Sequence, residues 1–209
     1  MSTDTVTDNS DIHRAGTGDR AGLNRVLAAA FLDDPVFRWL VPDDEERAPL
    51  LVPLFDLFAD AFARHGETHV AAVGGTASGA AMWSPPGVAP VHPDDEPALG
   101  EGMAAVCGPH MERMAICLEI FEAAHPREPA WFLQFLGVDP AAQGLGLGSA
   151  LLRATLARAD AAGEAAYLEA TSDRNRALYE RHGFRCIGEL PLPDGPVTYA
   201  MWRDPAPIR

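Results

Sequence analysis

The run WFLQFLGVDPAAQGLGLGS, residues 131–149, joins an apolar stretch to a glycine-rich turn. Residues 131–138 are apolar at nearly every position, which predicts a central strand buried on both faces. Residues 146–162 have helical periodicity, so the turn leads into a helix N-terminus. Glycines there leave backbone N–H groups free to close on an anion, and the helix dipole adds attraction. The natural ligand of such a turn is a phosphate or pyrophosphate.

Three phosphate motifs compete for this turn. A P-loop requires Lys followed by Ser/Thr after its last glycine, and this pair is absent. The dinucleotide fingerprint fits poorly, because its last glycine falls on Ser149 or Leu151. The pattern Gln/Arg-x-x-Gly-x-Gly/Ala is matched by Gln143, Gly146 and Gly148. Glycines at a strand-to-helix turn also occur for packing alone, so the turn by itself leaves that interpretation open.

Helices and strands alternate along the rest of the chain. Strand patterns and helical patterns in this order predict an α/β fold, a mixed sheet with helices on both faces. The predicted helices are 19–32, 45–65, 98–124 with a break near Gly108, 146–162 and 173–182. The predicted strands are 67–73, 77–83, 131–138, 165–170, 184–190 and 197–203, and 84–97 is predicted to be a proline-rich surface loop.

Length and charge limit the possible functions. The 209 residues fit a single domain over 12–209, preceded by a polar leader (1–11) that we expect to be disordered. The formal net charge of −14 argues against nucleic acid and anionic membranes as partners. No apolar run has membrane-spanning length, and no secretory signal is visible. Three cysteines without paired spacing argue against disulfides, so we expect a cytoplasmic protein.

Several motifs occur in a characteristic order. They are FLDDP (31–35), HPREPAWFL (125–133), GVDPAAQGLGLG (137–148) and LEATSDRNRALYERHGF (168–184). In this combination the chain resembles the GNAT acetyltransferase superfamily over about residues 12–203. Segments at 108–111, 126–133, 179–184 and 194–196 look like the puromycin N-acetyltransferase type. That type has an aromatic residue where this chain has Asp34. At this position the chain is similar to the wider, mostly uncharacterised branch of the superfamily.

The resemblance implies a GNAT fold, with a central mixed β-sheet of about six to seven strands flanked by helices. It implies that acetyl-CoA lies between two diverging parallel strands that end at Val138 and Ala170. The amide of Val138 would then stabilise the oxyanion of the tetrahedral intermediate. The residues that match cofactor-binding positions are Leu136, Gly137, Val138, Gln143, Gly144, Leu145, Gly146, Leu147, Gly148, Ser149 and Asn175.

Two residues are candidates for catalysis, one matched to the superfamily and one chosen by its place in the strand that flanks the gap. Tyr179 matches the acid that protonates the departing thiolate, and its alternative is a tyrosine packed on a helix face. Glu169 is the candidate base, acting through water, and its alternative is a solvated or salt-bridged strand carboxylate. No Cys/His cluster has metal-ligand spacing, so no metal is expected.

The acceptor site would lie along the first two helices and their connection. Phe31, Asp34, Phe37 and Trp39 are the candidate residues, and an aromatic and acidic pocket suits a hydrophobic cation. The alternative is that the aromatic residues are core and the acids form a solvated face.

The resemblance implies an acetyl-CoA-dependent N-acetyltransferase acting on the amine of a small molecule, with an aminonucleoside antibiotic or a related amine as the candidate acceptor. Since no activated nucleophile is evident, we expect direct transfer in a ternary complex, by a monomer or homodimer. Acetylation of a peptide or protein amine, or a non-catalytic acyl-CoA-binding regulator, are the alternatives.

Overall fold

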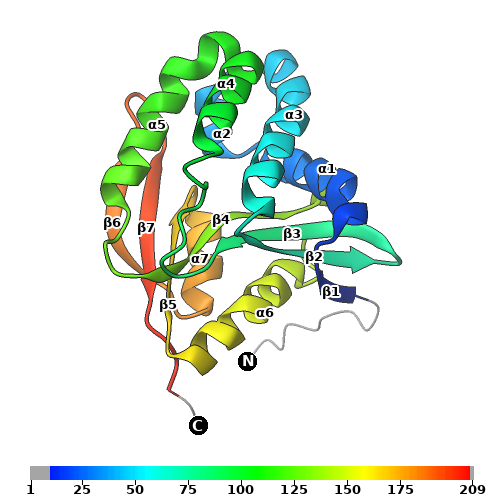
Figure 1. The fold of residues 1–209 in the computed structure, drawn as a ribbon, viewed down its shortest axis with the longest axis vertical. Coiled ribbons are helices and arrows are strands. Elements are labelled where there is room, and N and C mark those ends of the chain that lie inside the picture. The colour runs from blue at the N-terminus through cyan, green and yellow to red at the C-terminus, as the bar shows by residue number, and fades with distance from the viewer. Residues whose placement is uncertain (1–9, 208–209) are drawn as a thin grey trace.

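The computed structural model describes residues 10–207, which form one seven-stranded mixed sheet with helices on both faces (Figure 1). The strand order is β1-β2-β3-β4-β5-β7-β6, so the apolar strand β4 lies at its centre. All neighbouring strands are antiparallel except β4 and β5, which are parallel. The strands are β1 (Ser10–Arg14), β2 (Glu67–Val73), β3 (Thr76–Ser84), β4 (Ala130–Val138), β5 (Ala165–Ala170), β6 (Arg185–Pro191) and β7 (Val197–Arg203).

Helices α1 and α6 pack against opposite faces of the sheet at close range, as Figure 1 shows. A Cβ atom on Gly137 would lie 2.9 Å from side-chain atoms of Leu27 and Ala30 in α1. On the other face, a Cβ on Gly79 would lie 3.1 Å from Leu151 of α6. The helices are α1 (Arg20–Phe31), α2 (Pro35–Leu40), α3 (Asp44–Ala63), α4 (Glu96–Cys107), α5 (Met111–Ala124), α6 (Leu147–Ala162) and α7 (Asp173–Arg181), with short 3-10 turns η1 (Thr17–Asp19), η2 (Gly108–His110) and η3 (Pro140–Ala142).

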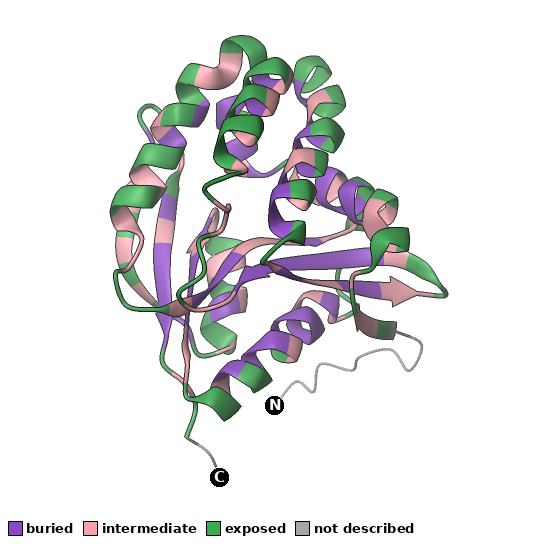
Figure 2. Cartoon of the chain, in the orientation of Figure 1, coloured by how far each residue is buried: buried purple, intermediate pink, exposed green. Residues whose placement is uncertain are grey.

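Buried residues line both faces of the central strands and the helix sides that cover them (Figure 2). One cluster fills the space between the sheet and α1, α2 and α3, and a second lies under α6 and α7. Within the part of the chain that the structure describes, no helix is both long and apolar enough to cross a membrane.

The expected helices and strands are confirmed to within a few residues, and the structure adds two elements. β1 covers residues 10 and 11, which were assigned to the leader, while residues 1–9 lie outside the described part. β1 has a single large apolar residue, Ile12, and is held as an edge strand by backbone pairing with β2. α2 has six residues, too few for a periodic pattern, and its signal is the Asp34 cap followed by Pro35.

Strands β4 and β5 separate halfway along β4. Their pairing runs from Ala130 opposite Ala165 to Leu133 opposite Leu168 and ends there, although β4 continues to Val138. The separation begins at a bulge, because Trp83 of β3 pairs with Leu133 and Met82 pairs with Phe135, which leaves Gln134 as an extra residue. A bulge bends its strand and increases the local twist. The expected diverging pair of parallel strands is therefore present.

Candidate active site

The register of β3 and β4 determines which backbone groups face the gap between β4 and β5. The amide of Asp139 donates to Ser78 O of the β3 side at 2.9 Å. Backbone groups alternate in direction along an antiparallel pair, so those of Val138 and Leu136 point away from β3. Both residues lie beyond the point where β4 and β5 stop pairing. Val138 O accepts a long contact from Gln143 Nε2 at 3.4 Å, and within residues 10–207 this edge of β4 pairs with no other strand of the sheet, which leaves it accessible to an extended ligand.

The glycine-rich turn presents unpaired N–H groups beside this edge. Gly144 and Gly146 have φ of 83° and 78°, a left-handed conformation that favours glycine. The N–H groups of residues 144–149 donate to no other residue between 10 and 207, because α6 begins at Leu147. Gln143 Oε1 accepts from Arg174 Nη2 at 2.8 Å, which brings a cation to the turn. This arrangement suits an anionic group such as a pyrophosphate.

A cavity of about 90 Å³ adjoins the point where β4 leaves β5. That volume holds several water molecules or a small amine. Six of the predicted site residues line it: Phe31, Phe37, Leu136, Glu169, Asn175 and Tyr179. The remaining lining residues are Val36, Leu40, Phe58, Met114, Cys117, Leu118, Phe121, Leu133, Gln134, Phe135 and Thr171. Polar groups from β4, β5 and α7 therefore meet an apolar wall made by α1, α2, α3 and α5.

Tyr179 lies at the polar side of the cavity, near the C-terminal end of α7. Its side chain is 6% exposed, and its ring packs against Phe184 with centroids 6.0 Å apart. Burial, and secondarily the nearby charge of Asp34, raise the pKa of the phenol well above its ordinary value. Among residues 10–207, no hydrogen bond contributes to the pKa of this hydroxyl. Tyr179 therefore carries its proton at neutral pH and has it available for a bound group.

Among the residues that the structure describes, Glu169 is the one carboxyl group that lines the cavity. Its Oε1 atom is buried and finds no hydrogen-bond partner among the residues the structure describes. Burial raises the pKa of Glu169 to about 8, although a hydrogen bond from Tyr167 acts in the opposite direction. A carboxyl group with a pKa in this range can gain and lose a proton near neutral pH. These properties fit a base or an amine-binding group.

Asp34 lies behind the cavity wall and organises it. Its Oδ1 accepts from the amides of Val36 and Phe37 at 2.9 and 3.3 Å, which caps α2. Its Oδ2 accepts from the Thr171 hydroxyl at 2.5 Å, and Thr171 Oγ1 in turn accepts from Asn175 Nδ2 at 3.2 Å. Burial raises the pKa of this carboxyl, and these hydrogen bonds oppose the rise. Asp34 thus ties α2 to the end of β5 and to α7 and does not itself line the cavity.

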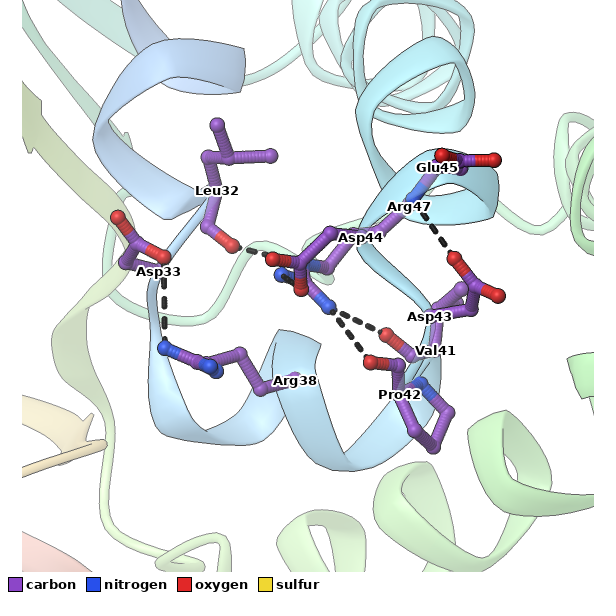
Figure 3. A network of polar contacts seen from close by, with 9 residues as sticks. All are labelled: Leu32, Asp33, Arg38, Val41, Pro42, Asp43, Asp44, Glu45 and Arg47. Carbon is purple, nitrogen blue, oxygen red and sulfur yellow. Dashed lines mark hydrogen bonds and ion pairs between the residues drawn. The ribbon is translucent and has the colours of Figure 1, made fainter.

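Arg47 holds α2 at both of its ends, as Figure 3 shows. The side chain is fully buried and donates to Leu32 O and to Val41 O, each at 2.7 Å, with a longer contact to Pro42 O. Its Nη2 atom also pairs with Asp44 Oδ1 at 2.5 Å. Leu32 precedes α2 and Val41 follows it, so one guanidinium fixes the span of chain that carries the cavity wall. Neither Arg47 nor this role was predicted.

The structure places the other predicted residues apart from the cavity. Trp39, proposed for the acceptor site, donates through Nε1 to Pro193 O at 2.9 Å and packs under Arg113. Ser149 is buried, with its hydroxyl 3.0 Å from His182 Nε2. Leu147 belongs to the core under α6.

Sequence reasoning also missed lining residues. Gln134 had a signal, as the one polar residue in an apolar strand, whereas Thr171 and Cys117 had none. Residues 10–207 contain no group of three or more potential metal ligands.

Comparison with known proteins agrees with this geometry. The sequence profile of the acetyltransferase (GNAT) family matches residues 28–184. A Corynebacterium glutamicum structure, described as histone acetyltransferase HPA2 and related acetyltransferase, is 32% identical with a TM-score of 0.72, covering 95% of this chain and 97% of that one.

Two further structures share the fold at lower identity. A Drosophila melanogaster polyamine N-acetyltransferase, which forms N-acetylagmatine, is 19% identical with a TM-score of 0.60, covering 93% and 99% of the two chains. The Escherichia coli ribosomal-protein-S18-alanine N-acetyltransferase is 18% identical with a TM-score of 0.56, covering 96% of each chain. The profile match over most of the chain and the 32% identical structure lead to one conclusion: this chain is an acyltransferase that belongs to the acetyltransferase (GNAT) family.

Proposed function

We propose that this protein transfers an acetyl group from acetyl-CoA to the amine of a small molecule, directly and without an acetyl-enzyme. The observation that carries the proposal is the cavity at the separation of β4 and β5, which Glu169 and Tyr179 both line. One residue offers a group that accepts a proton and the other a group that donates one. Acetyl transfer to an amine needs both.

The chain offers fitting partners for each part of acetyl-CoA, the co-substrate of the family. The unpaired N–H groups of residues 144–149 suit the pyrophosphate, with Arg174 adding positive charge. The free edge of β4 at Leu136 and Val138 suits the amides of the pantetheine arm. Such pairing brings the thioester to the end of the cavity where Tyr179 lies. The amide of Val138 is then available to stabilise the oxyanion.

The proposed reaction begins with a protonated amine and ends with an acetamide, free CoA thiol and one released proton. Glu169, directly or through water, accepts the proton that the ammonium loses. The amine lone pair then attacks the thioester carbonyl, and a C–N bond forms. As the tetrahedral intermediate collapses, the C–S bond breaks and the Tyr179 hydroxyl donates a proton to the departing sulfur. The nitrogen, which becomes positively charged on attack, loses its second proton to solvent, and Tyr179 regains a proton from solvent. Glu169 then releases the proton that it accepted, which is the one proton released in the overall reaction.

Mass spectrometry of the acceptor tests this proposal. Puromycin is one acceptor to try, together with simple primary amines, each incubated with the protein and acetyl-CoA. We expect one acetyl group on an amine and much slower product formation by Tyr179→Phe. Acetyl-CoA that binds but is transferred to no amine would contradict the proposal and favour an acyl-CoA-binding regulator. Transfer only to peptide N-termini would favour a protein acceptor.

A further inference from the structure

The cavity is divided between a polar side with one carboxyl group and an apolar wall. Among residues 10–207, Glu169 carries the only carboxyl group that lines it, and no arginine is among the lining residues. The Glu169 carboxyl also lacks a partner at Oε1. This buried oxygen lacks a hydrogen bond, and a single ammonium group supplies both that hydrogen bond and the opposite charge that favours the ionised carboxylate. The polar end of the cavity is therefore built for one positive charge.

The opposite wall is a group of phenylalanine rings in mutual contact. Phe31 contacts Phe37 and Phe135 with ring centroids 5.3 and 5.8 Å apart, and Phe58 contacts Phe135 at 4.9 Å. Such tilted and edge-on contacts build a preformed apolar surface that favours a flat or aliphatic body. A second ammonium in this part of the cavity would lose its water without gaining a carboxylate.

Asp34, whose charge acts on the lining residues Cys117 and Tyr179, is already engaged. Both of its oxygens accept hydrogen bonds, from the first amides of α2 and from the Thr171 hydroxyl, and it lies behind the wall. Acids elsewhere on the surface contribute to the net charge of −14 without lining the cavity. A dication therefore finds one ionic partner at this site.

We propose that the acceptor is a primary amine with a single positive charge on a compact apolar body, aromatic or aliphatic, whose ammonium pairs with Glu169. This inference rests on the proposed transferase function and narrows its substrate class. It separates this chain from the Drosophila relative that forms N-acetylagmatine, because agmatine carries two cationic groups. The selectivity lies in the apolar wall and in the single carboxylate.

A matched pair of amines tests the inference on the full chain. Pentylamine and cadaverine have the same carbon chain, and cadaverine adds a second ammonium. We expect kcat/KM, followed by CoA release and checked by mass spectrometry of the product, to be about 100-fold higher for pentylamine, since discrimination against an unpaired buried charge is large. 2-Phenylethylamine should match or exceed pentylamine, because its ring meets the phenylalanine wall.

A variant that adds a carboxylate at the cavity rim provides a second, independent test. Leu118 lines the cavity but is 44% exposed, so a charged side chain is tolerated there. Leu118→Glu should raise kcat/KM for cadaverine relative to pentylamine about 10-fold. Val52→Glu makes the same change at a site 46% exposed and outside the lining, and should leave the ratio unchanged.

The possible outcomes distinguish failure of this inference from failure of the proposed acetyltransferase function. An equal kcat/KM for cadaverine and pentylamine would overturn the inference and leave the proposed transferase function standing. An equal shift in the ratio by Leu118→Glu and Val52→Glu would also overturn it, because the effect would be one of overall charge. Release of CoA with none of the three amines, although acetyl-CoA binds, would overturn the inference together with acetyl transfer to small amines.

Discussion

Replacement of Glu169 by glutamine should stabilise the protein at alkaline pH while it impairs turnover. Burial raises the pKa of Glu169 from an ordinary 4.5 to about 8, so the folded state keeps a proton that the unfolded chain releases between these values. Stability from this group is full below pH 4.5 and is lost as pH rises to 8. Each pH unit in the window costs about 1.4 kcal/mol, so the wild type loses about 3 kcal/mol by pH 7.

Glutamine has nearly the same shape as the protonated acid and does not titrate, so the variant escapes this loss. The free energy of unfolding of Glu169→Gln should therefore gain about 4 kcal/mol on the wild type between pH 5 and pH 8. Chemical denaturation at several pH values measures this difference directly. Other titrating groups, including Glu122 and Tyr167 close by, contribute alike to both proteins and cancel. Glu119→Gln, a change at an exposed position of α5, should follow the wild-type curve.

Activity supplies the second half of the test. If Glu169 accepts the amine proton, the variant should lose about 100-fold or more in kcat/KM. A variant whose stability stays parallel to the wild type from pH 5 to 8 would refute the reasoning. In that case the carboxyl group is ionised in the folded protein throughout, and the argument for a poised base fails.

Three further substitutions separate chemistry, binding and architecture. Tyr179→Phe should lower kcat about 100-fold while it changes the Kd of acetyl-CoA less than about twofold, as stopped-flow and calorimetry would show, because no hydrogen bond within residues 10–207 contributes to the pKa of the hydroxyl. Equal losses in both would count against the acid role. Gly148→Ala should raise Tm slightly, since an added Cβ meets protein atoms only at 3.6 Å or more and lies in a helical turn that favours alanine. The same change should weaken acetyl-CoA binding at least tenfold. Unchanged affinity would show that this turn is not part of the cofactor site. Arg47→Met should cost about 3–5 kcal/mol of unfolding free energy, because it leaves buried carbonyl groups unpaired. Arg38→Met, at an exposed ion pair, should cost less than about 1 kcal/mol. Similar losses in the two variants would refute the role of Arg47 in holding both ends of α2.

Helices and strands with strong hydrophobic periodicity, or with clear turn residues at their ends, could be predicted from the sequence. The apolar run of β4 predicted the central strand, and strands at 67–73 and 77–83 were predicted on either side of the Gly74–Gly75 turn, where both glycines have positive φ. β1 and α2 could not be predicted in the same way. β1 depends on pairing with β2, which is 53 or more residues away along the chain, and such long-range pairing leaves no local pattern.

The candidate site was predictable where a motif carried it and not where packing made it. Glu169, Asn175 and Tyr179 were found by motif, and the structure brings them to one cavity. Of the wall opposite them, Phe31 and Phe37 were predicted, and the rest was not, because it collects side chains from α1, α2, α3, α5 and β4 by tertiary packing. Asp34 illustrates the difference, since its negative charge suggested contact with the acceptor, whereas its hydrogen bonds make it a cap that orients α2.

Direct transfer in a ternary complex is the central claim, and the composition of the chain makes it measurable. The 209 residues include 16 arginines and no lysine, so no lysine side chain can be acetylated by chance. The decisive measurement is intact-protein mass spectrometry after incubation with isotopically labelled acetyl-CoA, with and without pentylamine, alongside analysis of the amine. The account predicts an unchanged protein mass in both samples and labelled acetylpentylamine in the second. A protein that gains one labelled acetyl group from acetyl-CoA alone and loses it when pentylamine is added would contradict the account, because transfer would then pass through an acetyl-enzyme.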